Sequence, residues 1–132
     1  ASAITGENDI KFLERHGKPV VENRVGSERD MWKDILEQVK LGEDGYETAA
    51  VLVMTEAEAK KAYKYLKQYR EDVDRDSSSF KKGITVTPYY LAKGLEFDQV
   101  FVAGGNSNST FYEQYRYISA TRALHELYVY EY

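Results

Sequence analysis

Short apolar runs, separated by segments predicted as helices, constrain the fold of this chain more than any other feature. Two of them, Ala49–Met54 and Gln99–Ala103, are nearly continuous, and Ile84–Thr87 is short and β-branched. Runs without alternation are typical of strands covered on both faces, as in a parallel sheet. Glu126–Tyr132 alternates, and Pro19–Val25 is a weaker candidate. Strands that alternate with helices predict crossover units, so we expect an α/β fold with a mainly parallel sheet.

Two helices have recognisable starts. Ser27 is followed three residues later by Asp30, and Thr55 is followed three residues later by Glu58. A hydroxyl residue followed by an acid at this spacing is typical of a capping box. Apolar residues then recur at helical spacing in both segments. We expect the first helix to end at Gly42.

Two further segments have weaker patterns. Ile10–His16 is compatible with a short helix. Arg70–Gly83 is polar and serine-rich and ends in glycine, so we predict an exposed loop rather than a domain boundary.

Length and composition set outer limits. With 132 residues, one domain spanning the chain is expected. The absence of cysteine removes disulfides, thiolate metal sites and cysteine nucleophiles, and fits a cytoplasmic location. The net charge of −4 does not indicate a dedicated nucleic-acid coat protein. No apolar run approaches the ~20 residues of a membrane helix. The first residue is not Met, so we expect a C-terminal piece of a longer protein.

The stretch "LAKGLEFDQVFVAGG" combines a cation, a glycine and acids just before an apolar run. Ligands of open α/β sheets bind beyond the carboxyl ends of strands. We expect the segment Pro88–Phe97 to lie at that edge. There Gly94 would permit an unusual backbone conformation, Lys93 could meet a phosphate, and Glu96 could accept from a hydroxyl such as a ribose. The alternative is a solvated loop, because a lone Lys-Gly pair is a weak signal.

The third predicted helix spans Ser109–His125. One face carries Phe111, Tyr115 and Ile118. At about 100° per residue, Arg122 would lie in line with this stripe. A guanidinium among buried side chains is costly unless it is paired. It must therefore meet either an internal carboxylate, such as Glu96 or Asp98, or an anion beyond the helix end.

Two stretches together resemble a known family. "ITVTPYYLAKGLEFDQVFV", about residues 84–102, resembles motif V of UvrD/Rep-type superfamily 1 helicases. "EQYRYISATRALHELYV", about residues 113–129, resembles their motif VI. Both motifs appear in the family's order and spacing, and they look closest to the branch of HelD and DNA helicase IV. The resemblance covers the chain from about Tyr46 to its end.

The resemblance implies the second RecA-like lobe of a motor, with a three-layer fold of the P-loop NTPase type. In this family ATP lies between two lobes. By motif position, Arg122 is the arginine finger and Thr121 helps to orient it. Such a finger neutralises charge on the γ-phosphoryl group and contributes ~10³–10⁵ in rate.

The remaining candidate roles also come from the resemblance. Glu96 matches the glutamate that contacts the nucleotide sugar, Gly94 lets the backbone approach, and Lys93 lies near nucleotide and strand. Many relatives carry Thr-x-His before Ala-Lys-Gly, where this chain has Pro88 and Tyr90. Thr87 and Tyr90 are therefore candidates for nucleic-acid contact, the tyrosine by stacking on a base.

Half of such an ATP site is missing from the sequence. No Gly-x-x-x-x-Gly-Lys-Ser/Thr loop occurs, and Gly17-Lys18-Pro19 lacks the earlier glycine and the following hydroxyl. We predict no metal ligands in this chain. The Mg²⁺ that accompanies ATP would be held by the absent N-terminal lobe, so the isolated chain is predicted to be inactive.

Three functions follow as hypotheses. The first is a fragment of an ATP-dependent DNA helicase or translocase that acts on single-stranded or duplex DNA. The second is an ATP-driven RNA polymerase-binding or recycling factor of the HelD type, since some members of that branch associate with bacterial RNA polymerase. The third is a non-catalytic interaction module.

Other charged and aromatic groups have plainer explanations. The basic face Lys60–Lys67 and the pair Lys81 and Lys82 could contact nucleic acid, but a solvated helix face explains them better. The alternating tyrosines near the end indicate core and edge packing rather than a base platform: Tyr128, Tyr130 and Tyr132.

Overall fold

The computed structural model describes residues 20–42, 45–75 and 82–132. The strands are β1 (Val20–Arg24), β2 (Thr48–Val53), β3 (Val73–Asp74), β4 (Gly83–Pro88), β5 (Phe97–Val102) and β6 (Ala123–Glu131). The helices are α2 (Glu28–Gln38), α3 (Glu56–Lys67), the 3-10 turn η1 (Tyr89–Leu91) and α4 (Tyr112–Ala120).

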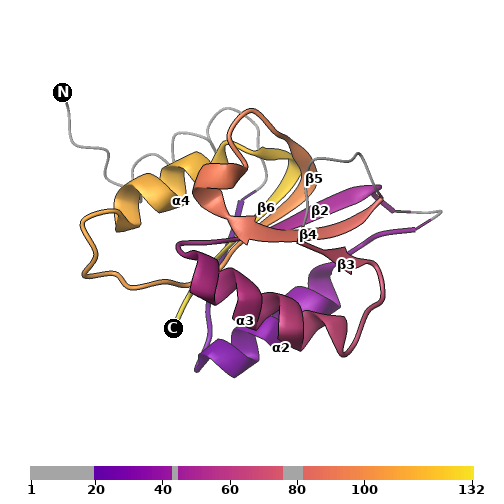
Figure 1. Ribbon diagram of the computed structural model, residues 1–132, viewed down its shortest axis with the longest axis horizontal. Helices are drawn as coiled ribbons and strands as arrows, with labels where there is room; N and C mark the ends of the chain where they lie inside the picture. The colour runs from indigo at the N-terminus through magenta and orange to yellow at the C-terminus, as the bar shows by residue number, and fades with distance from the viewer. Residues whose placement is uncertain (1–19, 43–44, 76–81) are drawn as a thin grey trace.

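The described strands form one sheet in the order β1-β6-β5-β2-β4-β3, and every neighbouring pair is parallel. Figure 1 shows α2 and α3 on one face of this sheet and α4 and η1 on the other. The predicted α/β class, with three layers and a parallel sheet, is confirmed. Parallel strands need long crossovers, and the helices serve as those connections.

The two predicted helix starts are confirmed. Ser27 Oγ accepts from the backbone N–H of Asp30 at 3.2 Å, and Thr55 Oγ1 accepts from that of Glu58 at 3.2 Å. Each bond satisfies one of the backbone donors that a helix leaves free at its first turn. Helix α2 ends at Gln38, before the predicted Gly42, because Val39 already has an extended backbone.

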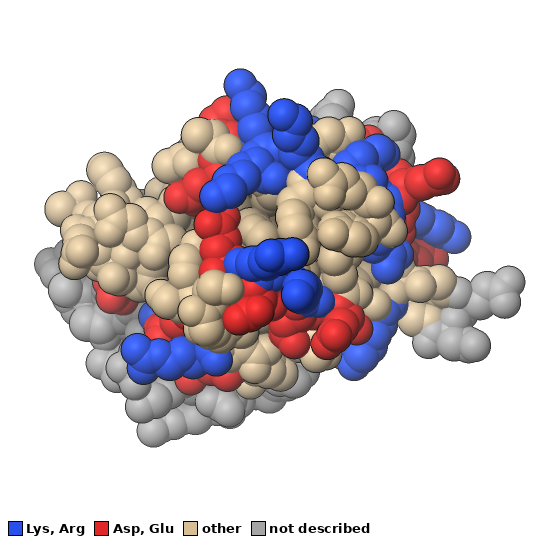
Figure 2. Space-filling view, turned by 90° about the horizontal axis from the view of Figure 1, so that it is seen from below, with Lys and Arg blue, Asp and Glu red and all other residues tan. Residues whose placement is uncertain are grey.

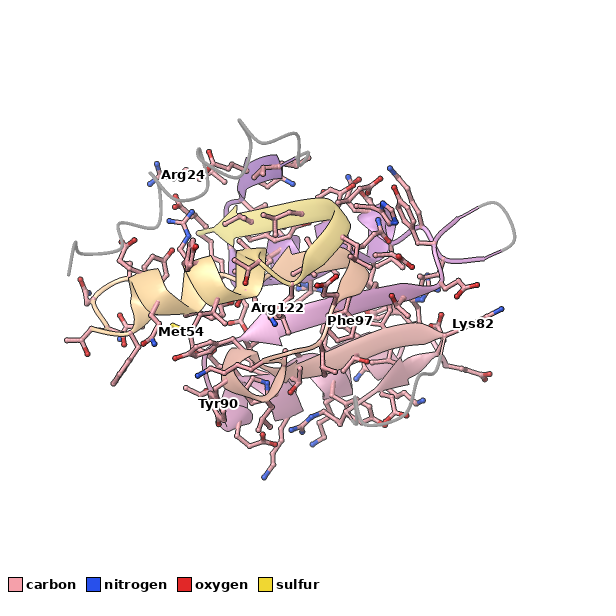
Figure 3. All side chains as sticks on the ribbon, turned by 90° about the horizontal axis from the view of Figure 1, so that it is seen from above. Arg24, Met54, Lys82, Tyr90, Phe97 and Arg122 are labelled. Atoms are coloured by element: carbon pink, nitrogen blue, oxygen red, sulfur yellow. The ribbon has the colours of Figure 1, made fainter. Side chains whose placement is uncertain are left out.

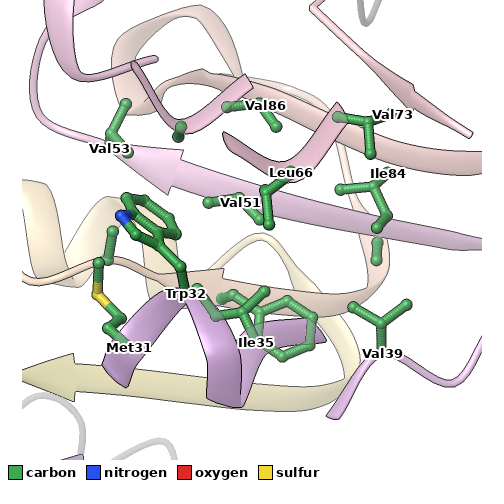
Figure 4. Close-up of a cluster of buried hydrophobic side chains, with 14 of the residues drawn as sticks. Met31, Trp32, Ile35, Val39, Val51, Val53, Leu66, Val73, Ile84 and Val86 are labelled. Atoms are coloured by element: carbon green, nitrogen blue, oxygen red, sulfur yellow. The ribbon is translucent and has the colours of Figure 1, made fainter. Parts of the chain in front are cut away.

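Each face of the sheet has its own apolar core. Figure 4 shows the core beneath α2 and α3, where Trp32 and Ile35 meet Val51 and Leu66. The other core lies beneath η1 and α4, and Tyr115 is fully buried in it. Strand β2 contributes to both, since five of its six residues are buried. This explains its continuous apolar sequence.

The third predicted helix is wrong at both ends. Helix α4 covers Tyr112–Ala120 only, and Phe111 is exposed rather than part of a buried stripe. Thr121 and Arg122 form a turn, and β6 begins at Ala123. The physical reason is pairing with a distant strand: the Phe97 N–H donates to Arg122 O at 2.9 Å, which draws the chain into the sheet.

The loop predicted at Arg70–Gly83 contains the short strand β3, and much of the rest of that segment falls outside the described residues. The helix predicted at Ile10–His16 also falls outside the described residues. The alternation predicted for the last strand is wrong: residues 127–130 of β6 are all buried, since both faces of the sheet are covered there.

In the described ranges no helix is long and apolar enough to cross a membrane.

Candidate functional site

The sequence-predicted site residues lie at two opposite edges of the sheet. β4 ends at Pro88, so Thr87 lies at the carboxyl edge. Glu96 and Arg122 immediately precede β5 and β6, so they lie at the amino edge. The prediction that all of Pro88–Phe97 lies at the carboxyl edge is therefore wrong for its second half. The segment must cross one face of the sheet, because two parallel strands begin at the same edge.

At the amino edge, Arg122 is half-buried and is held by neutral acceptors. Its Nε and Nη2 donate to Thr121 Oγ1 at 3.3 and 3.1 Å, and its Nη1 donates to Leu95 O at 3.5 Å. Thr121 Oγ1 in turn donates to Ile118 O at 2.7 Å, which fixes the hydroxyl. Thr121 thus orients the guanidinium. Figure 3 shows Arg122 and Phe97 near one another, where β5 and β6 start.

The alternative of a structural salt bridge is not realised in the described part of the chain. Asp98 Oδ2 accepts from the backbone N–H groups of Glu47 and Thr48, each at 3.1 Å, and its other oxygen faces His125. Glu96 is exposed. Among the described residues no carboxylate lies within ion-pair distance of Arg122. The described contacts of the Arg122 side chain are therefore with neutral oxygens only.

The turn before β5 requires a glycine. Gly94 has φ +82°, and a Cβ added there would meet nothing within 4 Å. The requirement is therefore conformational and does not arise from crowding. Lys93 and Glu96 flank this turn, and both are exposed. β5 and β6 are neighbours, so this turn lies beside Arg122, and Leu95 touches it directly.

The sequence analysis missed a cluster of aromatic and charged side chains next to Arg122, formed by Tyr46, Asp98, His125 and Glu126. The ring of Tyr46 stacks on that of His125, with centroids 5.3 Å apart and planes at 7°. His125 Nε2 lies 3.5 Å from Asp98 Oδ1. Tyr46 OH donates to Glu126 Oε2 at 3.0 Å. Asp98, His125 and Glu126 stand within the two motif stretches, but nothing local indicates that Tyr46, some 80 residues away, completes the cluster.

Glu126 has a perturbed ionisation. Burial raises the pKa of its carboxyl group, but hydrogen bonds from Tyr128, Gln99 and Tyr46 outweigh burial and leave the pKa below its ordinary value. The carboxylate is thus the form that the fold stabilises.

The two nucleic-acid candidates at the carboxyl edge differ. Thr87 is 2% exposed, and its hydroxyl donates to Pro88 O at 3.3 Å, so it is closed to a ligand in this conformation. Tyr90 is 45% exposed and packs edge-on against Tyr89, with ring centroids 5.6 Å apart. Of the two, only the Tyr90 ring offers a surface on which a base could stack.

The basic groups are dispersed. Lys61 pairs with Glu28 at 3.0 Å, and Lys67 Nζ donates to Glu71 O at 2.7 Å. Lys82 lies 3.9 Å from Glu47, and Lys81 falls outside the described residues. Figure 2 shows basic and acidic side chains mixed on the face seen from below. This supports a solvated helix face rather than a nucleic-acid track.

Four of the hollows on the described surface lie away from the site, since neither Arg122 nor Glu96 lines any of them. Across the described ranges, no three acids or histidines gather in a way that could hold a metal. Lys93, Glu96 and Arg122 are thus charged groups that lie together at the amino edge of the sheet.

The fold belongs to the α/β class with three layers and is consistent with a RecA-like helicase C-terminal domain. No protein-family model and no curated protein matches this chain. It is similar to the crystal structure of the C-terminal domain of a possible DNA helicase from Lactobacillus plantarum WCFS1. The identity is 26%, the match covers 99% of this chain and 88% of that chain, and the TM-score is 0.60. This similarity supports a helicase C-terminal domain.

Proposed function

We propose that this chain is the second RecA-like lobe of an ATP-dependent DNA helicase or translocase of the UvrD/Rep type, on the HelD-like branch. Its task would be to complete an ATP site whose phosphate loop and Mg²⁺ ligands belong to an N-terminal lobe. The observation that carries the proposal is Arg122, which is half-buried, oriented by Thr121 and without a carboxylate partner among the described residues.

The chemistry follows from charge. A guanidinium that is not neutralised by its own protein can stabilise the negative charge that develops on a γ-phosphoryl group. Orientation by Thr121 lowers the entropy lost when the contact forms. In this assignment Glu96 accepts from the sugar hydroxyls, Lys93 faces the phosphates, and the turn at Gly94 lets both reach the nucleotide. DNA would contact the carboxyl edge through Tyr90.

The test is Arg122→Ala in the full-length protein, measured as DNA-stimulated ATP hydrolysis. We expect kcat to fall by about 10³-fold or more, with a much smaller change in KM. Arg122→Lys should recover little, because lysine lacks the planar fork of donors. Arg29→Ala is the matched control, since Arg29 is exposed on α2, on the opposite face of the sheet. Unchanged hydrolysis in Arg122→Ala would refute the assignment.

A further inference from the structure

Strand β6 begins with an irregularity just after Arg122. Ala123 pairs with Phe97, but the next paired residues are Glu126 and Gln99, so the register shifts between them. Two residues of β6, Leu124 and His125, therefore stand opposite one residue of β5. This is a β-bulge, a device that bends a strand and redirects the side chains near it.

Both bulge residues are exposed, but His125 also has specific side-chain partners. His125 stacks on Tyr46 and places Nε2 3.5 Å from Asp98 Oδ1. Leu124 is 48% exposed. The His125 side chain is itself 57% exposed, so its two contacts with Tyr46 and Asp98, and not burial, hold the imidazole ring at the bulge.

The groups that hold His125 are themselves fixed. Asp98 Oδ2 accepts from the backbone N–H groups of Glu47 and Thr48, and the Asp98 N–H donates to Thr48 Oγ1 at 3.0 Å. The Tyr46 N–H donates to Lys40 O at 2.6 Å. Glu47 and Thr48 are therefore bonded to the start of β5, and the Tyr46 ring just before them stacks on the bulge residue His125.

The bulge is connected to Arg122 by short links. Only Ala123 and Leu124 separate Arg122 from His125, and Arg122 O accepts from the Phe97 N–H at 2.9 Å. A slip of one residue in a strand turns its side chains to the other face. Loss of the bulge geometry would therefore change the direction in which Arg122 leaves the sheet.

We propose that His125 is a positioning residue: clamped between Tyr46 and Asp98, it fixes the bulge that aims Arg122. The inference rests on the proposed function, because aiming matters only if Arg122 meets a ligand. It adds a role for His125, Tyr46 and Asp98, which lie behind the site and not in it.

The experiment uses the full-length protein and DNA-stimulated ATP hydrolysis. We expect His125→Ala to lower kcat by about 10- to 100-fold with KM for ATP little changed, since a small misplacement of a catalytic group has this cost. Leu124→Ala, the matched control in the same bulge, should leave both values unchanged. If His125→Ala does not fold, Tyr46→Phe and Tyr46→Ala replace it. Tyr46→Phe keeps the stacked ring and should keep kcat, whereas Tyr46→Ala removes the ring and should lower kcat by about 10- to 100-fold.

A double-mutant cycle separates positioning from general damage. If His125 acts through Arg122, then His125→Ala should have almost no further effect in an Arg122→Ala background. Multiplying effects would overturn the inference, as would an unchanged kcat in His125→Ala. The proposed function fails separately, by an unchanged kcat in Arg122→Ala alone.

Discussion

Replacing Glu126 by glutamine tests whether the amino edge is held together by one carboxylate. Its Oε1 accepts from Gln99 Nε2 at 2.9 Å and from Tyr128 OH at 2.7 Å. Its Oε2 accepts from Tyr46 OH at 3.0 Å and from Lys40 Nζ at 3.4 Å. Each carboxylate oxygen thus accepts from two donors. Glutamine has a single acceptor oxygen, so the two donors on one side must lose their acceptor and face an N–H₂ group instead.

The size of the loss follows from which pair is given up. Gln99 is fully buried, whereas Tyr46 and Lys40 lie nearer the surface, so the amide nitrogen should turn toward the latter pair. The contact with the exposed Lys40 contributes little. A hydrogen bond from Tyr46 to a charged acceptor contributes roughly 1.5–3 kcal/mol. We therefore expect Glu126→Gln to lower the free energy of unfolding by about 2 kcal/mol at pH 7.

The acid dependence gives a sharper signature. The folded pKa of Glu126 is lowered, so its contribution is present above the unfolded pKa and is lost as pH falls through the folded pKa. The variant has no carboxyl group at this position and lacks that contribution at every pH. The difference between wild type and variant should shrink as the solution becomes acidic.

Urea unfolding in steps from pH 7 to about pH 3 measures both quantities, since this range brackets the ordinary titration of glutamate. Glu37→Gln is the control: Glu37 is exposed on α2, and no hydrogen bond or ion pair is seen for it within the described ranges. It should change stability by under about 0.5 kcal/mol. A difference for Glu126→Gln that stays constant across the pH range would refute the electrostatic reasoning.

Two further substitutions test other parts of the fold by the same unfolding assay. Tyr115→Phe removes a buried hydroxyl that donates to Leu52 O at 2.7 Å and contacts Ala103 O, so we expect a loss of about 1–3 kcal/mol in the free energy of unfolding. Leu52 O also accepts from the Ala103 N–H at 3.0 Å, so no loss would mean that this backbone bond is sufficient. Gly94→Ala should cost about 1–2 kcal/mol, because φ is +82° there, and Gly94→Asn should cost less, because asparagine tolerates this conformation; equal costs would contradict a purely conformational role.

Features that depend on neighbouring residues could be predicted from the sequence. The starts of α2 and α3 could be predicted from Ser27 and Thr55, because a capping hydrogen bond joins residues only three positions apart. The strands β2, β4 and β5 follow from apolar runs that burial on both faces requires. The placing of Glu96 beside Arg122 was not predicted in this way, because it depends on the pairing of β5 with β6.

Features that depend on distant pairing could not be predicted. Helical periodicity predicted that the third helix continues to His125. The helix ends earlier because Arg122 O accepts a hydrogen bond from the Phe97 N–H of the neighbouring strand. The bulge at His125 and its contact with Tyr46 join segments far apart in the chain. Local propensity cannot report such contacts, because they form only when the sheet does.

The location of the charged site at the amino edge bears on how it could work. A pocket at the carboxyl edge is enclosed by the loops that follow the strands, whereas the groups at the amino edge come from the short turns before β5 and β6. Such turns are held firmly by the strands that follow them, and the cluster around Asp98 and His125 holds them further. They hold Arg122 in place, since its carbonyl accepts from the Phe97 N–H and its Nη1 donates to Leu95 O. Under the proposed function, the N-terminal lobe would supply the enclosing wall of the ATP site, and Arg122 would contribute a charge whose position is already fixed.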